Sequence, residues 1–231
     1  MNKLLEIYRR LYHAFGPQRW WPGETPFEIA IGAILTQNTN WGNVEKAIEN
    51  LKRDEALNVE SINNMKMERL ASLIKPAGYF NVKAKRLKAF IFFLRNEYHG
   101  SLKRMKKEEM QTLRVRLLQV HGVGPETADS ILLYALEKPV FVIDAYTKRI
   151  LSRHMLMEYD KSYEEFQKIF HSSLKRDVKF FNEYHALFVK LGKTYCKLKK
   201  PMCEECPLKN ISKTDNKILL SFPQKRESRH K

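Results

Sequence analysis

The feature that most constrains the fold is a pair of apolar, helix-periodic segments joined by a very short glycine turn. The first segment ends at Val120, the turn is Gly122-Val123-Gly124, and the second segment starts at once. Its apolar residues follow the spacing i, i+3, i+4, i+7, i+8, which places them on one face of a helix: Ala128, Ile131, Leu132, Ala135 and Leu136. The sequence therefore predicts two helices packed closely across a hairpin.

The turn itself has the chemistry of an anion site. Gly122 and Gly124 can adopt positive φ and allow close approach of a ligand to the backbone. The first N–H groups of the following helix have no intrahelical acceptor and lie at the positive end of its dipole. Val123 would fill the gap between the two helices. We predict that the turn binds a phosphate of DNA, and the alternative is an ordinary helix-helix turn.

Helix starts occur along the rest of the chain. Thr25, Pro26 and Glu28 form the pattern of a capping box with proline at the first helical position. Ser162 and Glu165 repeat the capping-box spacing before another apolar-periodic segment. These starts predict helices beginning close to residues 26 and 163.

The remaining patterns are also helical. Residues 83–95 carry apolar side chains at helical spacing, and Asn182 is expected to cap a helix that runs toward Cys196. Residues 138–143 are of β-forming types, but this run is short and isolated. The sequence therefore predicts an all-α fold.

Charge points to a polyanionic partner. The chain has a formal net charge of +16 and a pI of about 9.7, and basic groups that neutralise phosphates release counterions. An anionic membrane surface or simple solubility would also suit this charge. No apolar run approaches the roughly 18 residues of a membrane helix, and residues 1–15 lack the apolar core of a signal peptide. We expect no membrane association and a cytoplasmic protein, held at the nucleoid in a bacterium.

Asp144 closes the apolar run at residues 140–143, twenty residues after Gly124. A carboxylate in such a place is hydrogen-bonded, solvated or functional, because burying it alone is costly. Hydrolysis of an N-glycosidic bond develops positive charge on the sugar, which a fixed carboxylate stabilises while it orients water. The alternative is that Asp144 caps the helix 145–153, and it can do both.

The hairpin followed by this aspartate resembles the helix-hairpin-helix superfamily of DNA glycosylases, and several stretches resemble its 3-methyladenine branch, built on the endonuclease III frame. These stretches are WWP, LTQNT, PAGYFNVKAKRL and GVGPETADSILLYA. The resemblance is clear over about residues 20–150 and weaker to about 210. It implies a six-helix barrel lobe at 23–138 and a second helical lobe from 1–22 and 139–211. The polar, basic segment 212–231 reads as a flexible tail.

Aromatic residues supply a candidate pocket for a base. A base flipped out of the duplex is held by stacking, and aromatic faces attract the positive charge of alkylated purines. The resemblance implies that the following residues stack on the base: Trp20, Trp21, Pro22 and Trp41. It also places Gln37 and Asn38 as a polar wedge in the gap that the base leaves. The tryptophans could instead be core or rim residues.

Glu126 marks a departure from the family pattern. Endonuclease III-type enzymes carry a lysine here, on the second residue after the turn, which forms a Schiff base with the sugar. A glutamate cannot do so. Lys148 or another lysine could substitute, but no pattern in the sequence supports this alternative. We therefore expect a monofunctional glycosylase that uses water, with Glu126 beside the base pocket or simply favouring the positive end of a helix.

The three cysteines, Cys196, Cys203 and Cys206, lie within eleven residues in the pattern C-x6-C-x2-C. Such clustering suggests metal rather than a disulfide scaffold. Endonuclease III relatives continue with a fourth cysteine and bind a [4Fe–4S] cluster, where this chain has Ser212. The resemblance implies one such cluster, with Ser212 as a doubtful fourth ligand, and a three-iron, labile or absent cluster stays open.

Three hypotheses follow for the function. The first is a monofunctional glycosylase that releases an alkylated purine such as 3-methyladenine from double-stranded DNA, acting as a monomer. The second is an endonuclease III-like enzyme for oxidised pyrimidines, with or without lyase activity. The third is a DNA-binding hairpin module without catalysis, against which Asp144 argues.

Overall fold

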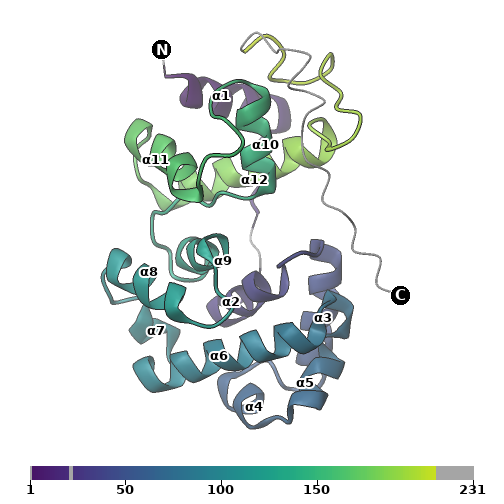
Figure 1. The fold of residues 1–231 in the computed structure, drawn as a ribbon, viewed down its shortest axis with the longest axis vertical. Coiled ribbons are helices and arrows are strands. Elements are labelled where there is room, and N and C mark those ends of the chain that lie inside the picture. The colour runs from purple at the N-terminus through teal and green to yellow at the C-terminus, as the bar shows by residue number, and fades with distance from the viewer. Residues whose placement is uncertain (1, 21–22, 212–231) are drawn as a thin grey trace. The chain divides into compact units, whose positions relative to one another are not determined.

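The computed structural model describes residues 2–20 and 23–211, and this part of the chain contains helices and no strand (Figure 1). The predicted all-α fold is therefore confirmed. None of the described helices is long and apolar enough to cross a membrane. Trp21, Pro22, Ser212 and the predicted tail lie outside the described residues.

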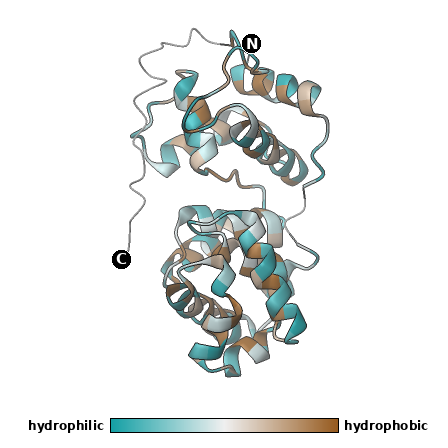
Figure 2. Cartoon of the chain, turned by 90° about the vertical axis from the view of Figure 1, so that its right-hand side faces the viewer, coloured by the Kyte–Doolittle hydropathy of each residue, from teal (hydrophilic) through white to brown (hydrophobic). Residues whose placement is uncertain are grey.

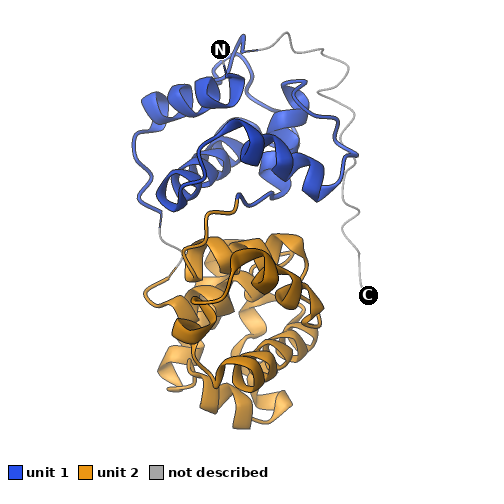
Figure 3. Ribbon diagram, turned by 90° about the vertical axis from the view of Figure 1, so that its left-hand side faces the viewer, with its two compact units in different colours: residues 1–20, 141–231 blue, residues 21–140 orange. Residues whose placement is uncertain are grey.

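The chain forms two compact units, shown separately coloured in Figure 3. Residues 1–20 and 141–231 belong to the first unit, and residues 21–140 form the second. The first unit contains α1 (Lys3–Phe15), α10 (Ala145–Arg153), α11 (Tyr163–Ser173) and α12 (Val178–Thr194). In the second unit lie α2 (Pro26–Leu35), α3 (Trp41–Arg53), α4 (Val59–Asn64), α5 (Met67–Leu73), η1 (Lys75–Ala77), α6 (Phe80–Tyr98), α7 (Leu102–Met105), α8 (Met110–Gln119), α9 (Pro125–Ser130) and η2 (Ile131–Ala135).

The helix starts follow the predicted caps, with one difference. Ser162 and Glu165 form both halves of a capping box at α11. At α2 the hydroxyl of Thr25 accepts from the Glu28 N–H at 3.1 Å. The Glu28 carboxylate, however, lies 3.0 Å from Lys52 Nζ, so it pairs with α3.

The predicted start of the last helix is wrong. Helix α12 begins at Val178, and its N-cap is Asp177, whose carboxylate accepts from the Phe180 N–H at 2.8 Å. Asn182 lies inside the helix. The earlier start brings Phe181, which is fully buried, into the helix and onto the core of the unit.

Residues 141–143 are buried and extended but pair with no strand in the described chain. Side chains of α11 satisfy their backbone instead: His171 Nε2 accepts from Phe141 N at 2.9 Å, and Gln167 donates to Phe141 O at 2.8 Å. The hydroxyl of Tyr163 accepts from Ile143 N at 3.2 Å. Buried backbone groups need hydrogen-bond partners. Side chains of α11 therefore provide hydrogen bonds that a neighbouring strand would otherwise provide.

Aromatic packing forms the core of the first unit. The rings of Phe141 and Phe170 stack with centroids 3.7 Å apart, and Tyr184 meets Phe141 edge to face at 5.6 Å. The Tyr184 hydroxyl donates to Leu4 O at 2.6 Å and so fixes α1 on α12. Figure 2 shows the apolar residues along the helices of each unit.

In the second unit, a buried ion pair joins the two helices of the hairpin. Arg114 on α8 donates to both carboxylate oxygens of Asp129 on α9, at 2.7 and 3.1 Å. The Asp129 side chain has no exposed surface. Beyond it, the predicted inner face of the second helix is buried as expected: Ala128, Ile131, Leu132, Ala135 and Leu136.

Breaking this ion pair should destabilise the protein. Asp129→Asn is expected to lower the free energy of unfolding by about 3 kcal/mol, because it leaves the Arg114 guanidinium facing a neutral amide. Glu97→Gln is the matched control, since it removes the carboxylate of the exposed Arg116–Glu97 pair at 3.0 Å and should leave the denaturant midpoint almost unchanged. Equal midpoints for the two variants would contradict this account.

Candidate active site

The hairpin turn uses its two glycines differently. Gly122 has φ of +81°, the left-handed region that favours glycine, whereas Gly124 has φ of −91° and is extended. The expectation of positive φ therefore holds for Gly122 alone. Nothing lies within 4 Å of a Cβ added at Gly124, which caps α9 without a side chain. Between them Val123 is buried and fills the space between α8 and α9, as predicted.

Gly122 packs directly on α6. A Cβ added there would lie 2.3 Å from Cγ of Arg86, so only glycine fits. The Arg86 guanidinium in turn donates to the side-chain oxygen of Gln37. The Gln37 amide nitrogen donates to Gly122 O and to Thr127 Oγ1, both at 2.9 Å. Gln37 thus fixes the turn through its hydrogen bond to Gly122 O, and Arg86 fixes Gln37.

The two residues predicted as a wedge differ in their surroundings. Gln37 uses its side-chain amide within the unit, on the hairpin. Asn38 is exposed and has φ of +55°. The structure brings Gln37 into contact with Gly122. Asn38, the next residue in the chain, is on the surface.

A buried lysine supports the same loop, and the sequence analysis missed it. Lys83 on α6 is 1% exposed, and its Nζ donates to Leu35 O at 2.8 Å and Ala77 O at 2.7 Å. Burial, with a smaller effect of Arg86, lowers the pKa of Lys83 to about 8. Lys83 thus ties the C-terminal end of α2, after which the 36–40 loop begins, to η1.

Asp144 stands at the start of α10. Its Oδ1 accepts from the Thr147 N–H at 2.7 Å, so the aspartate is the N-cap of Ala145–Arg153, as predicted. The side chain is only 12% exposed. Oδ2 lies 3.6 Å from His185 Nε2 on α12. The carboxylate is therefore held on one oxygen by a helix N-terminus and faced on the other by an imidazole.

These surroundings keep the carboxyl of Asp144 ionised. Burial acts to raise its pKa, but the electrostatic interaction with the imidazole of His185 and the hydrogen bonding from Thr147 outweigh it. The pKa is therefore lowered from the ordinary value of 3.8. His185 was missed by the sequence analysis, and its only signal there is a polar residue within the apolar run of α12.

The described tryptophans belong to different units. Trp20 is half-buried in the first unit and stacks on His185, with ring centroids 5.9 Å apart and planes at 29°. Trp41 starts α3 in the second unit, and its ring lies 3.3 Å from the position of a Cβ at Gly32. Trp20 thus joins the Asp144 group, and Trp41 covers α2. Glu126 is exposed in the first turn of α9.

The lysine considered as a substitute nucleophile is engaged elsewhere. Nζ of Lys148 donates to Lys161 O at 2.9 Å and lies 4.9 Å from the centre of the Phe166 ring. A Schiff base needs a free amine that can reach the sugar. The contacts of Lys148 hold its amine within its own unit.

The cysteine loop is anchored by two buried arginines of α10. Arg153 donates to Cys196 Sγ at 3.3 Å and to Lys197 O at 2.7 Å, while Arg149 donates to Cys196 O at 2.8 Å. Burial raises the pKa of Cys206 to about 11, and that of Cys203 is also raised. These effects favour neutral thiols, whereas metal ligation needs thiolates.

The described residues do not fit a [4Fe–4S] cluster. Such a cluster takes four thiolates, and the chain has three cysteines. Among the residues that the structure describes, no three histidine, cysteine, aspartate or glutamate side chains converge as a metal site. Ser212, the expected fourth ligand, lies outside them. We assign no catalytic step to a cluster.

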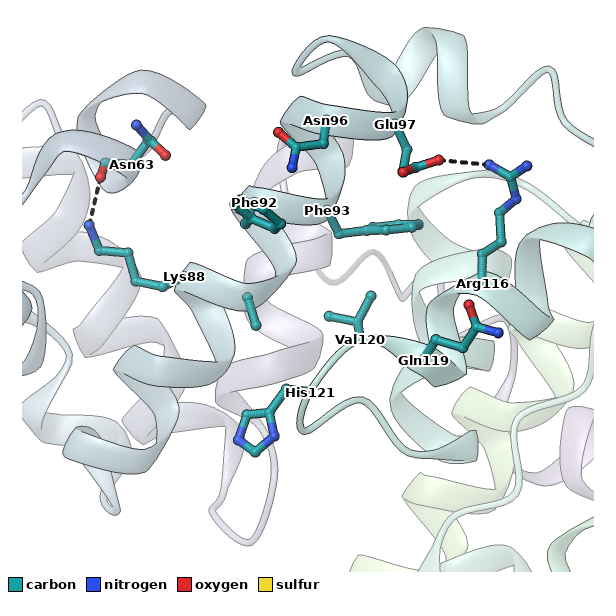
Figure 4. A pocket seen from close by; sticks show the side chains of 11 residues that line it. Asn63, Lys88, Phe92, Phe93, Asn96, Glu97, Arg116, Gln119, Val120 and His121 are labelled. Carbon is teal, nitrogen blue, oxygen red and sulfur yellow. Dashed lines mark hydrogen bonds and ion pairs between the residues drawn. The ribbon is translucent and has the colours of Figure 1, made fainter.

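A groove of about 880 Å³ lies on the second unit between α6 and α8 (Figure 4). Phe92, which is 66% exposed, and Phe93 contribute its apolar part. Two of its cations are engaged, Lys88 with Asn63 O at 2.7 Å and Arg116 with Glu97 at 3.0 Å. It is lined by α8 and by Val120 and His121 but contains none of the predicted site residues, so it is not the candidate active site.

Solved structures share this fold. A structure of the H. pylori 3-methyladenine DNA glycosylase bound to 1,N6-ethenoadenine is 28% identical and superposes with a TM-score of 0.72, covering 84% of this chain and 98% of that one. A non-covalent complex of endonuclease III with DNA gives a TM-score of 0.79 at 20% identity, covering 92% and 96%. The second similarity shows the fold alone.

Two relatives found by sequence similarity are likewise named as a DNA repair glycosylase and as endonuclease III. This chain is 47% identical over 210 residues to a protein of Methanocaldococcus jannaschii that is provisionally named a DNA repair glycosylase. The aligned residues cover 90% of this chain and 94% of that protein. Endonuclease III of Thermotoga maritima is 30% identical over 185 residues, 80% and 81% of the two chains.

The family assignment rests on most of the chain. Residues 31–176, which include the hairpin, Asp144 and α11, match the family described as HhH-GPD superfamily base excision DNA repair protein. Together with the endonuclease III-like fold, this match shows that the chain belongs to the HhH-GPD superfamily and is a DNA glycosylase of base-excision repair.

Proposed function

We propose that this enzyme is a monofunctional DNA glycosylase that hydrolyses the glycosidic bond of a flipped alkylated purine such as 3-methyladenine. The observation that carries the proposal is the carboxylate of Asp144, which is largely buried, held at the start of α10 and kept ionised. As the bond breaks, positive charge grows on the sugar, and a fixed negative charge in a poorly solvated place stabilises it strongly. The same carboxylate orients the water that attacks the sugar.

The residues at three described positions that bear on lyase chemistry support the use of water. Glu126 stands where the lyase enzymes of the family carry lysine, and it cannot form a Schiff base. The amines of Lys83 and Lys148 are hydrogen-bonded to backbone carbonyls of their own units. These three positions favour base release without strand cleavage.

An alkylated purine suits this mechanism. Such a base carries positive charge and leaves readily, so a carboxylate and water suffice without a strong acid. Trp20 and Trp41, one in each unit, have aromatic rings of the kind that attract a cationic base, and the resemblance assigns a stacking role to both and to Trp21 and Pro22. The similarity to the H. pylori 3-methyladenine DNA glycosylase supports this choice.

The hairpin would hold the DNA backbone. Gly122 brings the turn against α6, and Gly124 leaves open space over an α9 N-terminus that no side chain of its own caps. Backbone N–H groups at a helix N-terminus bind phosphate. We propose that Asn38, which is exposed and follows Gln37 in the chain, contacts the DNA, while Gln37 supports the hairpin through its hydrogen bonds to Gly122 and Thr127.

A second candidate function is the release of oxidised pyrimidines, with or without lyase activity. The 30% identity to endonuclease III of Thermotoga maritima favours it. A covalent DNA adduct trapped by borohydride would distinguish this function from the water-dependent one, because only a Schiff base is trapped.

Asp144→Asn should abolish base release. Asparagine is as good an N-cap as aspartate, so the variant is expected to fold while losing the negative charge. We expect wild type to free 3-methyladenine from methylated duplex DNA without cutting the strand, and Asp144→Asn to be slower by at least about 100-fold. Chromatography of the released bases measures this, and equal release by both proteins would overturn the role of Asp144.

The lowered pKa of Asp144 also has a consequence for stability. A carboxyl whose folded pKa lies below its unfolded value stabilises the fold above that value and loses this effect as pH falls through the folded pKa. Wild type should therefore unfold at a higher temperature than Asp144→Asn at neutral pH, and the difference should fade well below pH 3.8. A difference independent of pH would contradict the assignment.

The roles of the two hairpin glycines can be distinguished by substituting each of them. Gly124→Ser places a hydroxyl in open space, where it can accept from the first N–H groups of α9 and compete with a phosphate. Stability should rise by about a few tenths of a kcal/mol, while affinity for duplex DNA with an abasic-site analogue falls several-fold. Unchanged DNA affinity would remove these N–H groups from the DNA-binding surface.

Gly122→Ala is the contrasting variant. It forces alanine into positive φ and places Cβ against Arg86, so the free energy of unfolding should fall by at least about 1 kcal/mol. DNA affinity, measured below the unfolding transition, tests whether the displaced turn still binds. Full stability of Gly122→Ala would contradict the close packing described above.

The question of the cluster has a direct test in Ser212→Cys. This substitution completes the four-cysteine pattern of the relatives, so the variant should bind more iron and sulfide per chain than wild type after reconstitution. Cys206→Ser in the same variant should reverse the gain. Four irons bound equally by wild type would show that the chain holds a cluster with its own residues.

A further inference from the structure

The side chain of His185 lies beside Asp144, deep in the first unit. The residue is 4% exposed and stands on α12 among residues of the aromatic core, next to Tyr184. A polar ring in such a place costs free energy unless a polar partner compensates it. Tyr184, its neighbour on α12, donates its hydroxyl hydrogen to Leu4 O. The imidazole Nε2 of His185 faces the carboxylate of Asp144 at 3.6 Å.

The two oxygens of Asp144 have different surroundings. Oδ1 is fixed by the Thr147 N–H at 2.7 Å, whereas Oδ2 faces His185 Nε2 at 3.6 Å. This distance is longer than a normal hydrogen bond. Catalytic hydrogen bonds are often long in free enzymes and shorten when substrate binds. Oδ2 is therefore the oxygen whose direction His185 can control.

Aromatic rings fix the plane of the imidazole. Trp20 stacks on it, with centroids 5.9 Å apart and planes at 29°, and Phe141 meets it edge to face at 6.4 Å. Phe141 lies three residues before Asp144, so His185 packs against the segment that leads into the carboxylate. His185 thereby connects a half-buried tryptophan of the candidate base pocket with Asp144.

We propose that His185 is a positioning residue for the glycosylase reaction: it holds Oδ2 of Asp144 in the direction of the sugar and stabilises the carboxylate as an anion. It acts through Asp144 and does not touch the substrate. This inference rests on the proposed role of Asp144 and adds a residue that neither sequence motif contains. Orientation of a catalytic group by a hydrogen-bonded neighbour typically changes rates by roughly 10- to 100-fold.

Two amide substitutions distinguish the effect of a donor placed within reach of Asp144 Oδ2 from the effect of a polar side chain alone. In His185→Gln the amide nitrogen extends to about the place of Nε2, whereas in His185→Asn it is too short to reach Oδ2. Both variants keep a polar, uncharged side chain on α12. We compare full-length proteins in single-turnover base release from methylated duplex DNA and in binding to a duplex with an abasic-site analogue.

The expected result is a loss of chemistry without a loss of binding. His185→Asn should slow base release roughly 10- to 100-fold at unchanged DNA affinity, and His185→Gln should restore a rate close to that of wild type. Equal rates for wild type and His185→Asn would overturn the proposal. So would a parallel fall in rate and affinity that His185→Gln does not relieve.

A stability measurement distinguishes failure of this inference from failure of the proposed substrate. If wild type frees no methylated base, the alkylpurine assignment falls, and the contact is then judged by thermal unfolding of Asp144→Asn, His185→Asn and the double variant. Shifts in midpoint that are less than additive would support the pairing of the two side chains. Strictly additive shifts would overturn it.

Discussion

A largely buried carboxylate sets the conditions that the first unit has to meet. Removing a negative charge from water is costly unless hydrogen bonds and opposite charge compensate it. Asp144 accepts a hydrogen bond from the N–H of Thr147 at the start of α10, and its other oxygen faces the imidazole of His185 on α12. These two contacts need α10 and α12 side by side, and Gly192 makes that possible because a Cβ there would lie 2.2 Å from the Tyr146 ring.

The extended segment before Asp144 meets a related requirement. Its backbone is buried without a strand partner in the described chain, and α11 supplies the missing hydrogen bonds through His171, Gln167 and Tyr163. The carboxylate therefore follows a segment whose backbone is hydrogen-bonded at Phe141 and Ile143. Such bonds hold the segment in place, and a charge stabilises a transition state best when it needs no reorganisation as the bond breaks.

In the second unit, the hairpin turn is likewise held by hydrogen bonds from side chains of other elements. The turn is fixed by a ladder of polar contacts, from Arg86 to Gln37 and from Gln37 to Gly122 and Thr127. The bidentate pair of Arg114 and Asp129 holds the two hairpin helices together. Gln37 shows that a residue of a family motif can stabilise the hairpin, since its amide donates hydrogen bonds to Gly122 O and Thr127 Oγ1.

Much of this protein followed from local sequence patterns. The helical fold, the hairpin, the buried face from Ala128 to Leu136 and the cap at Asp144 all depend on spacing along a few turns of chain. The start of α12 was predicted wrongly, because the sequence analysis placed the cap at Asn182 and the structure has it at Asp177. The earlier start brings the buried Phe181 into the helix.

Long-range partners could not be predicted in this way. His185 lies 41 residues from Asp144, and Arg86 lies 36 residues from Gly122, so no spacing relates them. A lone histidine or arginine in a helix gives no sign of the carboxylate or turn that it will meet. The sequence by itself determined which elements form and which motifs they carry, because those depend on neighbours along the chain. Only the tertiary structure decided which buried polar groups compensate one another, because that depends on which helices come into contact.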